Sequence, residues 1–250
     1  MTHEHLYFWM MAFIRAGGLL AMTPVFSGKT IPIPVRLAIA GFLAYAAGGF
    51  VNATAPLPAD MLLLVLSSFH ELMTGLLMGL AVRLIFFAIE MAGQIISTEM
   101  GLVMSSQVDP ISQINSTSVG TALFYLGSLL FLISGAHHAV FAAFLRSFTL
   151  SPPGSIGFSA SAGENIAHAG GSIFLIAVQM SAPILATNFV VTLSFAILGK
   201  AAPSMNVFAE SFAARILAGL VLLALTMGLT AQLVLSHLKG APELMLRFIP

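Results

Sequence analysis

Few side chains in this 250-residue sequence are of types that carry covalent or metal chemistry. The chain has no cysteine, which excludes disulfides, thiolate metal sites and cysteine nucleophiles. His70 and Glu71 resemble half of a zinc-protease helix, but no second histidine follows at the required i+4 spacing. His137 and His138 point about 100° apart on a helix and would not readily bind one metal together. The sequence therefore predicts no catalytic residue, no metal and no cofactor.

A stripe of small residues that also carries two charges follows one side of the proline-free segment 61–104. At about 100° per residue, the following residues fall near one line: Gly75, Gly79, Arg83, Glu90, Gly93, Ser97 and Gly101. Small residues let helices pack closely, whereas charges inside a membrane are candidates for a proton or ion relay. Because glycines flank the charges, we favour a subunit-packing seam in which Arg83 and Glu90 meet partners on other helices. Arg15, in the first apolar stretch, is expected to snorkel or to form an interhelical pair.

A polar segment, 105–118, lies between two strongly apolar stretches and contains a single charge, Asp109. Its candidate residues are Ser105, Ser106, Gln107, Asp109, Pro110, Ser112, Gln113, Asn115, Ser116 and Thr117. One interpretation is an ordinary exposed loop. The other is irregular backbone that lines an aqueous path, which is tolerated at membrane depth only inside protein. The residues alone leave both interpretations open.

The elements that must position these residues are apolar helices. Of all residues, 58% are apolar and 7% are charged, with a mean hydropathy of +1.01, whereas soluble domains carry about 25% charged residues. We predict an all-α, polytopic membrane protein of about six to seven helices or helical hairpins, because helices satisfy the backbone in lipid. The expected helices span 6–26, 36–54, 60–82, 84–106, 118–146, 170–199 and 208–238. No basic run is present that could bind nucleic acid.

Three segments carry a resemblance to one known family. They are Phe13-Ile14-Arg15 through Pro24-Val25-Phe26-Ser27 with Ile31-Pro32, Pro34 and Arg36-Leu37; Gly93-Gln94 through Met100-Gly101-Leu102 with Asp109-Pro110; and Ala202-Pro203-Ser204-Met205-Asn206-Val207-Phe208 with Arg215. Together they resemble the FliR family of the type III export gate, found in flagellar and virulence systems. Ser204 stands where this family usually has Gln, and Ala213-Ala214 replaces a common proline-containing pair.

The resemblance implies a gate subunit that assembles with FliP-like and FliQ-like subunits into a helical ring, the channel for unfolded flagellar proteins. It divides the chain into a FliP-like part, 1–180, and a FliQ-like hairpin, 181–250. The residues assigned to the turn of this hairpin are Lys200, Pro203, Asn206 and Arg215. It also assigns the segment 105–118 to a pore plug. Further expected partners are FlhB-like and FlhA-like components and membrane lipid. The expected location is the bacterial inner membrane, in the flagellar basal body, with part of the chain above the bilayer.

Three alternatives stay open. A virulence-secretion gate subunit is the nearest alternative within the family. A stand-alone proton- or ion-coupled transporter would use Arg83 and Glu90, but no inverted repeats support it. An intramembrane enzyme would need a nucleophile–base pair or metal-ligand spacing, and the sequence has neither.

Overall fold

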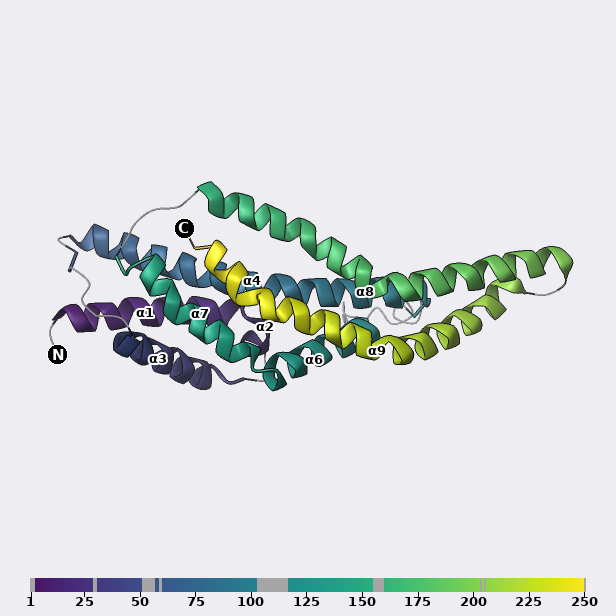
Figure 1. Cartoon of the computed structure of the whole chain (residues 1–250), viewed down its shortest axis with the longest axis horizontal. Helices are drawn as coiled ribbons and strands as arrows, with labels where there is room; N and C mark the ends of the chain where they lie inside the picture. The colour runs from purple at the N-terminus through teal and green to yellow at the C-terminus, as the bar shows by residue number, and fades with distance from the viewer. Residues whose placement is uncertain are drawn as a thin grey trace. The chain divides into compact units, whose positions relative to one another are not determined.

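The described part of the computed structural model is almost entirely helical (Figure 1). It comprises residues 3–28, 31–50, 57–58, 60–102, 117–154, 160–202, 204 and 206–249. The helices are α1 (His3–Met22), α2 (Pro24–Ser27), α3 (Ile33–Phe50), α4 (Met61–Glu99), α6 (Ser118–Ile133), α7 (Ala136–Leu150), α8 (Ala160–Ala201) and α9 (Val207–Arg247). No strand occurs among these residues. The predicted all-α class is confirmed.

Four of these helices are long and apolar enough to cross a membrane. They are α1, α4, α8 and α9, and a fifth crossing is present if α6 and α7 together form one broken span. An apolar helix of about 20 residues spans the hydrocarbon layer with its backbone hydrogen bonds satisfied internally. The chain is therefore a polytopic, membrane-embedded protein.

Helix α4 is continuous over 39 residues. Two helices, 60–82 and 84–106, were expected in this proline-free region. No residue in α4 lacks a backbone N–H, so nothing interrupts the hydrogen-bond ladder. Proline alone does not end the longer helices, since α8 continues through Pro183 and α9 through Pro242.

The helix expected over 118–146 is wrong as a single element. Helix α6 ends at Ile133, and α7 begins at Ala136 after Gly135, which has a φ of 73°. This left-handed conformation is readily adopted by glycine because glycine has no Cβ. The turn is closed by hydrogen bonds from the Gly135 N–H to the Leu132 carbonyl (3.3 Å) and from the His138 N–H to the Gly135 carbonyl (2.9 Å).

The chain forms two compact units, and neither is continuous in sequence. The first unit contains residues 1–85, 131–171 and 237–250. In this unit α3 packs against α1 and α7, and the buried side chains of α1 include Phe8, Met11 and Leu19. This apolar interior also contains two fully buried charged side chains, Arg15 and Glu71.

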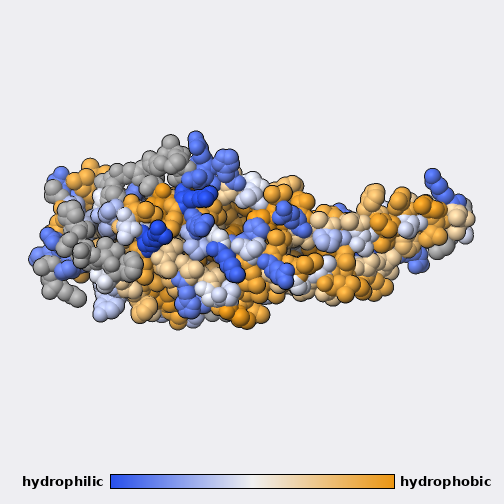
Figure 2. Space-filling model, in the orientation of Figure 1, coloured by the Kyte–Doolittle hydropathy of each residue, from blue (hydrophilic) through white to orange (hydrophobic). Residues whose placement is uncertain are grey.

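The second unit contains residues 86–130 and 172–236. Its parts of α8 and α9 form an antiparallel hairpin, in which Val207 packs on Gly199 beside the turn (Figure 1). Much of the surface of this hairpin is hydrophobic, as the orange residues over it in Figure 2 show. The predicted division between 180 and 181 falls within α8 and stays a prediction.

Candidate functional site

A fully buried ion pair joins α1 to α4 in the first unit. The Arg15 Nε donates to Glu71 Oε2 at 2.6 Å, and the Arg15 Nη2 donates to Glu71 Oε1 at 2.9 Å. Both side chains have a relative exposure of 0%. This two-point geometry matches the planar guanidinium to the carboxylate and is stronger than a single contact. The expected interhelical pair of Arg15 is confirmed, and its partner is the acid beside His70.

The remaining contacts of Arg15 tie the end of α7 to the same pair. Its Nη1 donates to Ser147 Oγ and its Nη2 to the Ser151 carbonyl, both at 2.9 Å. The guanidinium carbon lies 4.2 Å from the centre of the Phe148 ring. These contacts reach α1, α4 and the end of α7 at once, so the cluster is suited to holding three helices together.

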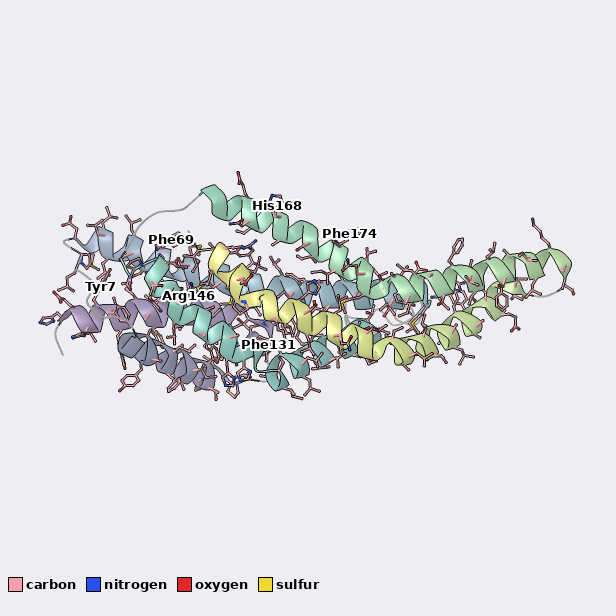
Figure 3. The ribbon with its side chains drawn as sticks, in the orientation of Figure 1. Tyr7, Phe69, Phe131, Arg146, His168 and Phe174 are labelled. Atoms are coloured by element: carbon pink, nitrogen blue, oxygen red, sulfur yellow. The ribbon has the colours of Figure 1, made fainter. Side chains whose placement is uncertain are left out.

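Helices α1 and α4 lie side by side and run parallel, with close packing at glycines (Figure 1). The Tyr7 hydroxyl, near the start of α1 in Figure 3, donates to Ser67 Oγ at 3.0 Å. Farther along, a Cβ on Gly75 would overlap the Arg15 carbonyl oxygen. A Cβ on Gly79 would lie 2.6 Å from the Leu19 carbonyl oxygen. The first two glycines of the predicted stripe therefore pack against α1 of the same chain.

The third stripe glycine packs in the second unit. A Cβ on Gly93 would overlap the Cα atom of Gly120, so the backbones of α4 and α6 touch at this crossing. Gly120 was not among the predicted site residues. Its position as a small residue near the start of an apolar helix could have indicated a close helix contact. The faces of these glycines are covered by helices of the same chain. Contact of the stripe with another subunit stays a prediction.

The other stripe residues have different environments. Arg83 and Glu90 are half-buried, and Ser97 is fully buried, its Oγ without a hydrogen-bond partner among the described residues. Gly101 has a φ of 77° and ends the helix. The N–H groups of Gly101 and Leu102 donate to the carbonyls of Thr98 (3.0 Å) and Ser97 (2.9 Å). These paired bonds form a Schellman motif, which needs a left-handed residue at this position.

A stacked aromatic–cation contact covers the end of α4. A Cβ on Gly101 would lie 2.6 Å from the Phe212 ring of α9, so only glycine leaves room for this ring. The Arg215 guanidinium carbon is 4.8 Å from the centre of the same ring, and its Nη2 donates to Ser211 Oγ at 3.1 Å. Gly101 of the predicted stripe and Arg215 of the predicted hairpin turn therefore both contact the Phe212 ring.

Thr117 has the role of a helix cap. Its Oγ1 accepts a hydrogen bond from the Gly120 N–H at 3.2 Å, three residues into α6, as an N-cap side chain does. The polar segment therefore has a packed structure on each side. The Schellman motif and Phe212 lie before it, and the Thr117 cap and the Gly93–Gly120 crossing lie at its end. The other plug candidates, from Ser105 to Ser116, lie outside the described residues.

The turn between α8 and α9 is only partly described. Lys200 is exposed in the last turn of α8. Asn206 caps α9, since its Oδ1 accepts from the Ala209 N–H at 3.3 Å. Pro203 lies outside the described residues.

The described residues contain no group of three or more His, Asp or Glu side chains that could hold a metal. The rings of His137 and His138 nevertheless stack with their centres 3.9 Å apart, closer than the helical angle between them indicated. His137 Nδ1 lies 3.5 Å from the Phe131 carbonyl oxygen, across the break between α6 and α7. The two histidines therefore belong to the structure of this turn.

The fold and these contacts define a membrane-embedded, all-helical protein whose buried polar groups join helices. Residues 6–241 match the family described as bacterial export proteins, family 1, and the chain belongs to this family. It is 28% identical over 232 residues to the flagellar biosynthetic protein FliR of Caulobacter vibrioides, covering 90% of each chain. It is 26% identical to FliR of Escherichia coli (91% of this chain, 86% of the relative) and 27% identical to FliR of Bacillus subtilis (88% and 85%).

Proposed function

We propose that this chain is a subunit of the flagellar type III protein export gate. In this role it would form, with FliP-like and FliQ-like subunits, the channel for unfolded flagellar proteins in the bacterial inner membrane. The observation that carries the proposal is the match to an export-protein family over residues 6–241. The three relatives compared above are all flagellar proteins by name, which favours the flagellar system over the virulence counterpart.

The polar segment between α4 and α6 is the proposed plug of this channel. Its neutral Ser, Thr, Gln and Asn side chains can satisfy one another while closed. They also move at a lower desolvation cost than several charges would. A plug must open without displacing the helices beside it. The caps at Gly101 and Thr117 support this role, because they fix the end of α4 and the start of α6. Partners or a substrate would then open the pore by favouring the displaced position.

The hairpin of α8 and α9 is the proposed contact with neighbouring subunits. In the most apolar part of α8, 28% of the residues are buried among the described residues, and in that of α9 only 6% are. Such apolar surface must face lipid or protein. FlhB-like and FlhA-like components would join the same complex, which we place in the flagellar basal body. Covalent catalysis forms no part of the proposed mechanism.

Deletion of residues 113–116 tests the plug. Thr117 is retained because it caps α6. We expect the deletion variant to assemble with its partner subunits but to make the membrane leaky to small ions, since the sealing residues are lost while the anchors remain. Dye uptake or conductance measures the leak, and the yield of co-purified complex is measured in parallel.

A deletion of equal length, residues 156–159 in the Ser/Gly/Pro-rich segment 151–163, is the matched control and should leave the membrane tight. An assembled 113–116 deletion that also stays tight would show that this segment does not seal the pore.

A further inference from the structure

A groove of about 510 Å³ opens between the first turns of α1 and the last turns of α3, within the first unit. The residues that line it are His5, Leu6, Trp9, Tyr45, Ala46, Gly48 and Gly49. Its volume is in the range of small-ligand sites, and most of its lining is apolar. It is distinct from the buried Arg15 cluster and from the anchors of the polar segment.

Two amphipathic aromatic side chains form the wall of the groove. The rings of Trp9 and Tyr45 meet edge to face, with centres 5.6 Å apart and planes at 90°. Gly48 permits this arrangement, since a Cβ there would lie only 3.3 Å from the indole Nε1. Neither the indole N–H nor the phenol hydroxyl forms a hydrogen bond with the described part of the chain. Both polar atoms therefore remain able to bind a ligand.

The position of the groove along the helices indicates the level of a membrane–water boundary. It lies where α1 begins with His3, Glu4 and His5, beside the carboxyl-terminal end of α3. Tryptophan and tyrosine concentrate at this level in membrane proteins, because their rings prefer acyl chains while their polar atoms prefer the headgroup region. Leu6 and Phe42, exposed at 65% and 69%, extend the apolar surface on the two helices.

We propose that this groove is a binding site for one membrane phospholipid. An acyl chain lies along Leu6, Ala46 and Gly49, and the ester and phosphate oxygens accept hydrogen bonds from Trp9 Nε1, the Tyr45 hydroxyl and a ring N–H of His5. A phospholipid fits better than a polar metabolite, because the groove is apolar over most of its lining and only a few of its lining residues carry polar side-chain atoms. The inference requires only that the chain is membrane-embedded, and it does not depend on the proposed export role.

The chain offers a direct probe, since Trp9 is its single tryptophan. Detergent-solubilised full-length protein is titrated with a phospholipid brominated on its acyl chain, and quenching of the Trp9 fluorescence is recorded. A specific site gives quenching that saturates at equimolar lipid while detergent remains in large excess. Quenching that rises in proportion to the lipid fraction without saturation would overturn the proposal, because it would indicate only general lipid contact.

Two glycine variants on α3 sharpen the test. Gly49→Leu places a side chain in the groove, where nothing lies within 4 Å of the added Cβ, and should weaken the apparent lipid affinity about tenfold. Gly41→Leu is the matched control, because it also meets nothing within 4 Å but does not line the groove, and it should bind like the native chain.

A second measurement separates lipid from a protein occupant. If the Gly49→Leu variant lowered the yield of complex with partner subunits while lipid quenching stayed unsaturable, the groove would be a subunit contact and the proposal would be wrong. Retention of a phospholipid by the native chain and the Gly41→Leu variant in native mass spectrometry, with its loss from the Gly49→Leu variant, is the result that supports the site.

Discussion

Arg15 and Glu71 are buried as a pair whose hydrogen bonds extend to Ser147 and Ser151. Removing two charges from water is costly, and their attraction offsets this cost only when the geometry is good and the other donors are satisfied. Here the guanidinium makes four hydrogen bonds and also lies over the Phe148 ring. The main effect of the pair is therefore to set the positions of α1, α4 and α7 relative to one another. Its net contribution to the free energy of unfolding is smaller, because burying the charges is costly.

At this residue scale, we predict that a single substitution in the pair lowers the free energy of unfolding far more than a double substitution does. Arg15→Ala leaves the Glu71 carboxylate buried without its partner and should lower the free energy of unfolding by about 3–5 kcal/mol. The double variant Arg15→Met/Glu71→Leu removes both charges and should recover most of that loss. Thermal unfolding in detergent provides the measurement.

Arg146→Ala serves as the control for this cycle. Arg146 is exposed on the same helix as Ser147 (Figure 3), and its loss should change the free energy of unfolding by less than about 0.5 kcal/mol. Equal destabilisation by Arg15→Ala and Arg146→Ala would show that the buried pair does not hold α1 and α4.

At the scale of elements, the contact between α1 and α4 depends on the absence of Cβ atoms. Gly18 lies where a Cβ would be 2.9 Å from the Leu72 carbonyl oxygen, and Gly75 and Gly79 face α1 in the same way. The helices can therefore approach until their backbones touch, which brings Arg15 within reach of Glu71. The glycine crossing and the ion pair support one another.

Gly75→Ala tests this coupling with the smallest added group. The new methyl would overlap the Arg15 backbone, so the helices must separate, and we expect a loss of about 1–3 kcal/mol in the free energy of unfolding. Gly17→Ala on α1 meets nothing within 4 Å and should instead be neutral or stabilising by up to about 1 kcal/mol. The melting temperatures in detergent compare the two variants, and a Gly75→Ala chain as stable as the Gly17→Ala chain contradicts the close crossing.

At the scale of the whole molecule, hydrophobic surface exceeds what the chain can bury on its own. In the second unit the hairpin exposes Phe189, Leu217 and Leu225, the last at 76%. Patches of this kind mark contacts with lipid or with other subunits. In a protein of the export family, this hairpin is the surface on which we expect neighbouring subunits.

A photo-crosslinking amino acid at Leu225 tests that expectation. We predict covalent adducts with FliP-like or FliQ-like subunits when these are co-expressed, because the Leu225 side chain is largely exposed on the hairpin. Gel shifts and mass spectrometry identify the adducts. The same probe at exposed Glu164, near the start of α8, controls for random collision. Adducts with lipid alone at Leu225 would place this face in the bilayer.

The class of protein was predictable from the sequence by itself. Low charge and long apolar runs predicted a helical membrane protein, and the structure confirms this class. The two helices expected over 60–82 and 84–106 are instead one continuous helix, α4. Helix-forming periodicity and hydropathy are local properties, so they can be read without knowing which segments meet. The family resemblance was also visible, because three short segments occur in the right order.

The partners of the polar and small residues were decided only by the tertiary structure. Glu71 lies 56 positions from Arg15, and nothing in either segment specifies the other. The stripe predicted as one surface instead packs against α1 at Gly75 and α6 at Gly93, and ends in a helix cap at Gly101. A repeat along one helix shows which residues share a face. Which helix covers that face depends on how close the backbones approach after folding, and this information is not local.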